Sequence, residues 1–153
     1  MTFNTLINKK LVSEERIELS DLLEGQNKLG VKIPPDYCYL LLNSNGYSCK
    51  SGFEISIDKL NPIVEINDFL NLEWLIKERE YDLKDNDAEV YRDKFIKIAS
   101  CFNQDRILMG FQEDVLNEIY LLEYDEDRIV KICNSIFELI NSHLIPMKSS
   151  QMK

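Results

Sequence analysis

Glycine is scarce in this chain of 153 residues. The five glycines are Gly25, Gly30, Gly46, Gly52 and Gly110. A dinucleotide-binding turn (Gly-x-Gly-x-x-Gly) and a phosphate-binding loop both need glycines at short, fixed spacings. No two glycines form Gly-x-Gly. Gly25 and Gly30 have the phosphate-loop spacing, but Val31-Lys32 follows them instead of Lys and then Ser or Thr, so nucleotide binding through either motif is excluded.

Histidine and paired cysteines are almost missing as well. The one histidine, His143, falls at the end of the last predicted helix, where a cation complements the helix dipole. Cys38, Cys49, Cys101 and Cys133 are far apart, whereas structural zinc sites use closely spaced pairs. We therefore expect no catalytic residues, no metal and no cofactor. Thiols among apolar neighbours are expected to behave as small buried side chains.

No apolar run reaches the roughly 18 residues that cross a bilayer. The start, "MTFNTLINKKLVSEER", does not have the basic-then-apolar order of a signal peptide. We expect a cytoplasmic protein that does not bind membranes. The length suits one domain, expected over residues 1–147, with a flexible tail at 148–153.

Positive charge is in deficit, because 18 Lys and Arg face 27 Asp and Glu and the net charge is −9. Such a surface repels phosphate backbones, so direct nucleic-acid binding is not expected. A basic protein would be attracted. Acids concentrate in two segments, residues 78–93 and residues 113–127. The second of these segments contains no Lys or Arg. These segments are either solvated strand edges and loops or a face that docks a basic protein.

Carboxylates can also bind calcium or hydrolyse glycosides. Asp85, Asp87 and Glu89 resemble the first ligands of a calcium loop, but Val90 stands where glycine is needed and Ile96 where glutamate is needed. The pattern therefore indicates a solvated loop. Glycoside hydrolysis by paired carboxylates stays open, although nothing in the sequence places two of them in a cleft.

Helices are predicted from apolar spacing and from cap residues. In "LGVKIPPDYCYLLLNSNGY", Pro34 and Pro35 suit a first helical turn and Asn45-Gly46 suits its end. A preceding helix, capped by Ser13 or Ser20, should end near Leu29. Two later helices are predicted at residues 68–83, capped by Asn71, and at 134–143, capped by Asn134.

Strands are predicted from alternation. Residues 52–60 should expose Glu54, Ser56 and Asp58, and residues 61–67 begin near Pro62, where a missing donor is tolerated. Residues 94–100, 105–111, 117–125 and 128–133 read as a meander, and 84–93 as an exposed loop or frayed helix end. The predicted fold is α+β: one domain with a mostly antiparallel sheet of about five or six strands, flanked by helices.

Three blocks of the sequence resemble the SUKH superfamily, the domain of fungal cell-wall-assembly regulators and of many bacterial immunity proteins. The first is "SDLLEGQNKLGVKIPPDYCYLLLNSNGY", the second "FIKIASCFNQDRILMGF" and the third "NEIYLLEYDEDRIVKICNSIFELI". The resemblance covers about residues 20–144. The matching positions of the first block are Leu29, Gly30, Ile33, Pro34, Asp36, Tyr37, Leu41, Asn45 and Gly46. The chain departs from the pattern at Gln26, Tyr47 and Gln104, which are turn and surface positions.

The resemblance implies an α+β domain without catalytic residues, which binds another protein. In bacteria such domains typically neutralise a cognate polymorphic toxin, often a nuclease or a deaminase. Such a toxin is expected to be basic where it holds phosphate. The fungal relatives suggest an alternative, a regulatory or scaffolding module. An unrecognised hydrolase is the third hypothesis.

The partner-binding residues are predicted from charge and from one aromatic position. Acids of the 78–93 segment and of the 113–127 segment would face the basic toxin domain. Tyr47, just after the second helix, would anchor the interface or pack in the core. The predicted set is Tyr47, Asp82, Asp85, Asp87, Glu89, Glu113 and Asp114.

Overall fold

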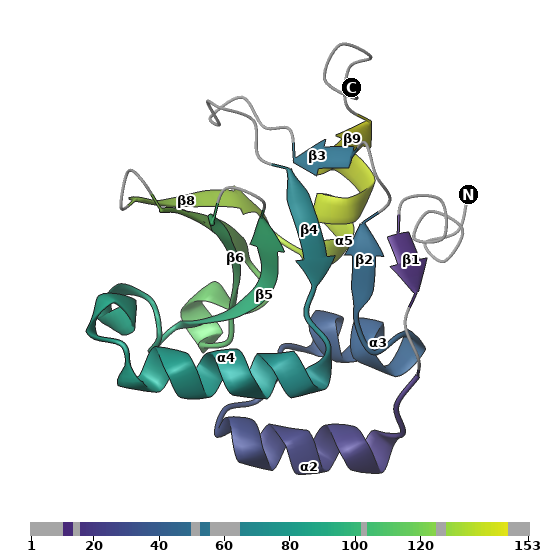
Figure 1. Cartoon of the computed structure of the whole chain (residues 1–153), viewed down its shortest axis with the longest axis vertical. Helices are drawn as coiled ribbons and strands as arrows, with labels where there is room; N and C mark the ends of the chain where they lie inside the picture. The colour runs from purple at the N-terminus through teal and green to yellow at the C-terminus, as the bar shows by residue number, and fades with distance from the viewer. Residues whose placement is uncertain are drawn as a thin grey trace.

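The computed structural model describes residues 11–13, 16–49, 53–55, 65–101, 104–124 and 128–146. Figure 1 shows a curved antiparallel sheet, with α4 across its lower end and α2 beneath α4. The strand order in this sheet is β1-β2-β4-β5-β6-β7-β8, and β3 pairs with β9 in a separate ribbon. The α+β fold with an antiparallel sheet is confirmed. The boundary at residue 147 stays a prediction, because residues 147–153 lie outside the described ones.

The elements have the following bounds. The strands are β1 (Leu11–Ser13), β2 (Tyr47–Cys49), β3 (Phe53–Ile55), β4 (Ile66–Phe69), β5 (Phe95–Cys101), β6 (Arg106–Gly110), β7 (Ile119–Glu123), β8 (Arg128–Cys133) and β9 (Leu144–Pro146). The helices are α2 (Leu19–Leu29), α3 (Pro35–Asn43), α4 (Leu72–Lys84) and α5 (Ile136–Glu138), and α5 continues into a π-helical turn, η3 (Leu139–His143). Two short 3-10 turns are η1 (Asn86–Val90) and η2 (Glu113–Val115). None of the described helices is long and apolar enough to cross a membrane.

The four-strand meander and the first three helices lie where the sequence predicts them. Asn71 caps α4, because its side chain accepts a hydrogen bond from the Trp74 amide at 2.8 Å. The cap of α2 is Glu18 rather than Ser13 or Ser20, since Glu18 and Asp21 form a reciprocal capping box. Ser135, not Asn134, caps the last helix.

The middle strands differ from the prediction. Strand β4 begins at Ile66 and includes Asp68, which was predicted to be helical; Pro62 lies outside the described residues, as do Ser56, Ile57 and Asp58. Glu54 was predicted to be exposed, but it is only 4% exposed. The reason is that β3 pairs with β9 and also contacts β4 and η3, so both of its faces are covered. Strands β1, β2 and β9 have three residues each, too few to show alternation.

Both faces of the meander are covered, which explains the uninterrupted apolar run of β6. The larger core joins the sheet to α2, α3, α4 and α5 through residues such as Ile98, Ile107 and Leu139. A smaller cluster on other side chains of the meander contains Phe95 and Leu108, packed against Tyr91 after η1. Alternate residues of one strand therefore enter two separate cores.

One buried tyrosine fastens α3 to the sheet. The Tyr37 hydroxyl donates a hydrogen bond of 2.5 Å to the Leu70 carbonyl and lies 3.3 Å from the Ile98 carbonyl. Leu70 is the residue between β4 and Asn71, so this contact fixes the entry into α4. Burial raises the pKa of the Tyr37 hydroxyl, which therefore remains a donor.

Tyr37→Phe keeps the ring but removes the hydroxyl, so the Leu70 carbonyl loses its buried donor. We expect the free energy of unfolding, measured by urea denaturation, to fall by about 1–3 kcal/mol. The matched control is Tyr81→Phe, since Tyr81 is 58% exposed, and it should change stability by less than about 0.5 kcal/mol. Equal losses in the two variants would contradict this account.

Candidate functional site

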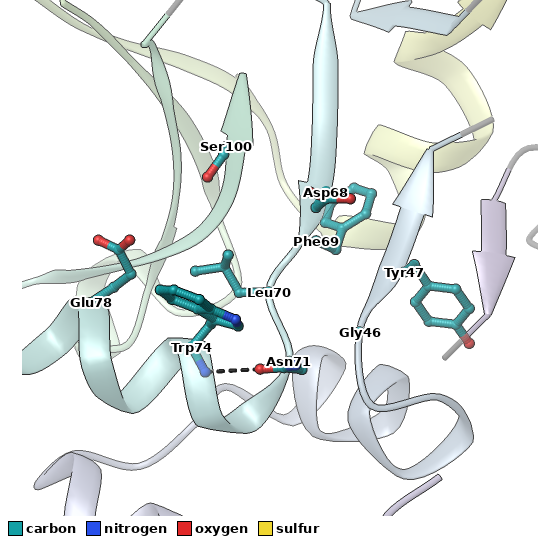
Figure 2. A pocket seen from close by; sticks show the side chains of 9 residues that line it. All are labelled: Gly46, Tyr47, Asp68, Phe69, Leu70, Asn71, Trp74, Glu78 and Ser100. Carbon is teal, nitrogen blue, oxygen red and sulfur yellow. Dashed lines mark hydrogen bonds between the residues drawn. The ribbon is translucent and has the colours of Figure 1, made fainter. Parts of the chain in front are cut away.

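A groove of about 460 Å³ lies where β2, β4, β5 and the start of α4 meet (Figure 2). We call it the α4 groove. Trp74 and Glu78 project into it from α4, Asp68 and Phe69 come from β4, and Ser100 comes from β5. The complete lining is Gly46, Tyr47, Asp68, Phe69, Leu70, Asn71, Trp74, Glu78 and Ser100.

The floor of the α4 groove is held by one side-chain and one backbone hydrogen bond. The Asn45 side chain accepts a bond from the Leu72 amide at 2.8 Å, and the Leu70 amide donates to the Ile98 carbonyl at 2.7 Å. Gly46 has φ +102°, and a Cβ placed there would lie 3.1 Å from the Asn71 Cβ. Only glycine suits both the left-handed backbone and the close approach. The groove therefore has a fixed floor.

The α4 groove carries two carboxylates and one exposed aromatic ring. Glu78 forms an ion pair of 3.3 Å with Lys97, whereas Asp68, half-buried, has no ion pair with any residue that the structure describes. Trp74 is 50% exposed, and the Lys77 ammonium lies 4.8 Å from its ring centroid. One wall of the groove is thus aromatic and another is anionic.

The fold brings the two acidic segments of the sequence together. Ala88 in η1 and Val115 after Glu113 and Asp114 pack on the same small apolar cluster. Lys94 joins the segments, because its ammonium lies 2.7 Å from Asp114 and its carbonyl accepts a bond from the Phe111 amide. We call this region the acidic end; its members are Asp85, Asp87, Glu89, Glu113 and Asp114.

Within the acidic end the side chains differ in their surroundings. Asp87, Glu89, Glu113 and Asp114 are exposed. Asp85 is half-buried and caps η1, accepting a bond from the Asp87 amide at 3.0 Å. These five predicted site residues are therefore at or near the surface, in one region of the fold.

Cations from neighbouring elements neutralise much of the charge that the sequence concentrates in residues 113–127. The pairs are Asp114 with Lys94 at 2.7 Å, Glu118 with Lys131 at 2.7 Å and Glu123 with Arg128 at 2.8 Å. The hydrogen bonds from Lys94 and Lys131 lower the pKa values of Asp114 and Glu118. Within the described ranges, Asp87 and Glu113 have no such pair, so they carry uncompensated charge.

Two predicted site residues are not on the acidic surface. Tyr47 is 4% exposed and packs in the main core, although one side of it lines the α4 groove. Of the two roles predicted for it, interface anchor and core residue, the structure shows the core residue. Burial raises the pKa of its hydroxyl. Asp82 is only 1% exposed, so its carboxylate is not on the surface, where a partner-binding acid was expected. It lies in α4, on the side that faces η1 and β6.

Asp82 belongs to a buried polar network that the sequence analysis missed. The Tyr91 hydroxyl donates to the Asp82 carboxylate at 2.7 Å, and Arg106 donates to the Tyr91 oxygen at 2.6 Å. Arg106 also lies 3.7 Å from Asp82. Because Tyr91 follows η1, the network fastens the acidic end to α4 and β6. The only signal in the sequence was an aspartate on the apolar side of a predicted helix.

Burial determines the titration of this network. Desolvation raises the pKa of Asp82, while the Tyr91 hydrogen bond and the Arg106 charge oppose that shift. One Asp82 oxygen and the Arg79 Nε are buried without a hydrogen-bond partner among the described residues. The network therefore orders the fold at some cost in stability when Asp82 is ionised.

Burial disfavours the thiolate form of two candidate nucleophiles, Cys38 and Cys133. Burial raises the pKa of the Cys133 thiol to about 12 and also raises that of Cys38. His143 is half-buried, with its Nε2 3.9 Å from Glu138. A search of the described residues finds no group of three or more His, Cys, Asp or Glu arranged to hold a metal ion.

Asp82→Asn tests the cost of the buried carboxylate. Because the pKa of Asp82 is raised in the folded state, folded protein binds more protons than unfolded protein between the two pKa values, and stability falls as pH rises through that interval. The asparagine does not titrate. The stability advantage of wild type over Asp82→Asn should therefore decline with pH above the ordinary value of 3.8 and then level off.

The measurement is urea unfolding at intervals from about pH 3.5 to about pH 7. The matched control is Asp87→Asn, which removes an exposed aspartate from the same region of the fold. An advantage of wild type that grows with pH would show that the Tyr91 and Arg106 contacts outweigh desolvation.

A comparison with curated proteins finds no match to this chain. The model of the SMI1 / KNR4 family (SUKH-1) matches residues 16–142, which include α2 through most of η3. The matched region contains Tyr37, Asn45 and Gly46, which build the floor of the α4 groove. The chain belongs to the SMI1 / KNR4 family (SUKH-1).

Proposed function

We propose that this chain is a non-catalytic, cytoplasmic protein-binding domain: an immunity protein that binds and neutralises a cognate bacterial toxin domain. The observation that carries the proposal is the acidic end, where two segments far apart in the sequence converge with uncompensated charge on Asp87 and Glu113. Family membership supports a binding role. The partner would be a basic protein, with nuclease or deaminase domains as the expected classes.

The electrostatic reason is direct. A nuclease needs basic residues where it holds the phosphate backbone, and an acidic surface of another protein can occupy that region. The acidic end is suited to this because the buried Asp82–Tyr91–Arg106 network fixes η1 before the partner arrives. A fixed surface loses less conformational entropy on binding than a loose loop would.

A regulatory or scaffolding module is the second candidate, favoured by the family's cell-wall-assembly regulators. The two roles differ in genetic context. A neighbouring gene for a large protein with a toxin-like C-terminus supports the immunity role. In that case, cells that produce the toxin should grow again when this chain is co-expressed. A hydrolase would instead show turnover that is lost when Asp68 or Glu78 of the α4 groove is replaced.

The triple variant Asp85→Asn, Asp87→Asn, Glu89→Gln tests the acidic end. Asparagine at position 85 keeps a side chain that can cap η1. We expect the rate of association with the toxin domain encoded by the neighbouring gene to fall by about tenfold at low salt. The salt dependence of that rate should also flatten, because the electrostatic attraction that steers the basic toxin is weaker. The measurement is stopped-flow association over a series of salt concentrations.

A matched control removes the same charge elsewhere. Glu24, Glu73 and Glu80 are exposed on α2 and α4, and their replacement by Gln should leave the association rate within about twofold. If both triples slow association equally, overall charge is responsible and the acidic end is not the docking surface.

A further inference from the structure

We propose that the α4 groove binds the side chain of an arginine presented by a protein partner. The groove is separate from the acidic end, and this inference does not depend on the immunity role. Its volume, about 460 Å³, lies within the range for ligand sites, about 300–1,000 Å³, and leaves ample room for an arginine side chain.

Asp68 supplies the charge complement. Of the two carboxylates in the groove, Glu78 forms an ion pair with Lys97 at 3.3 Å, while Asp68 has no ion pair with a described residue. Asp68 is half-buried, so an incoming cation would be partly shielded from solvent there. A carboxylate can accept two parallel hydrogen bonds from a guanidinium, which a single ammonium cannot provide in the same plane.

Trp74 supplies the second contact. The indole lines the groove and is 50% exposed, a large apolar surface that the protein itself leaves uncovered (Figure 2). The ring already holds one cation, since Lys77 lies 4.8 Å from its centroid. A planar guanidinium stacks on an indole and pairs with a carboxylate at the same time. Trp74 and Asp68 offer those two surfaces in one groove.

The N-terminus of α4 lies at the groove and by itself favours an anion over a cation. A helix N-terminus attracts anions through its unpaired amides. Here Asn45 accepts the Leu72 amide and Asn71 accepts the Trp74 amide, both at 2.8 Å. With those amides occupied and Asp68 without an ion pair among the described residues, an anion would meet repulsion. The cation is therefore the favoured occupant.

The groove is also rigid enough to discriminate. Its floor is fixed by the Tyr37 and Asn45 hydrogen bonds and by the close contact of Gly46 with Asn71. A fixed site keeps Asp68 and Trp74 in place before the arginine enters, so less ordering is needed on binding.

The test uses the full chain labelled with ¹⁵N. Trp74 is the single tryptophan, so one indole N–H resonance reports on the groove. The probes are N-acetyl-arginine amide and N-acetyl-citrulline amide, which have similar shapes but differ in charge. We expect a saturable shift of the Trp74 signal with the arginine probe, and binding of the citrulline probe at least about fivefold weaker.

Variants locate the contact. Asp68→Asn should weaken binding of the arginine probe about threefold to fivefold, whereas Glu24→Gln, the control at an exposed position of α2 outside both candidate surfaces, should leave it unchanged. Backbone amide spectra establish that each variant is folded. The proposal is overturned if both probes bind equally, if Asp68→Asn has no effect, if Glu24→Gln has the same effect, or if inorganic phosphate produces the larger shift. No partner protein is used, so the result stands apart from that of the toxin-association experiment.

Discussion

The fold depends on how the chain passes from β4 into α4. At this point the Tyr37 hydroxyl holds the Leu70 carbonyl, the Asn45 side chain holds the Leu72 amide, and Gly46 lies against Asn71. Tyr37 lies in the first turn of α3, and Asn45 and Gly46 lie just beyond its end, so all three residues come from far earlier in the sequence. A buried carbonyl or amide without such a partner would cost about 1–3 kcal/mol, so these contacts determine where α4 begins and in which direction it runs.

The position of α4 in turn places both candidate binding surfaces. Its first turns carry Trp74 and Glu78 to the α4 groove, and its last turns carry Asp82 to the network that holds η1 and the acidic end. The helix has 13 residues and is about 20 Å long at 1.5 Å per residue, and the two surfaces lie toward its opposite ends. A partner must be a folded domain or a long segment to reach both at once. A small molecule or a short peptide could occupy only one.

Local patterns allowed the sequence to predict much of the fold, and long-range contacts account for what it missed. The prolines at the start of α3, the Asn71 cap of α4 and the alternation of the meander depend on neighbouring residues, so they could be predicted directly. The α4 groove could not, because its walls come from segments more than 50 residues apart, Gly46 and Ser100 among them. The burial of Asp82 could not be predicted either, because its partners Tyr91 and Arg106 both lie beyond the end of α4.

The distribution of charge on the folded surface could not be predicted from local sequence either. That distribution also indicates how binding could be specific. The sequence assigns seven acids and no bases to residues 113–127, yet Lys94, Lys131 and Arg128 pair with acids of that segment from adjacent strands and turns. Charges more than about 8 Å apart are largely screened in physiological salt, so the net charge of −9 contributes little to the geometry of any one contact. In the proposed complex, the geometry would depend instead on the few carboxylates that the fold leaves uncompensated among the described residues. Asp87 and Glu113 lie at one end of α4 and Asp68 at the other, so a partner with basic residues at a matching separation would be selected over a protein that is merely basic.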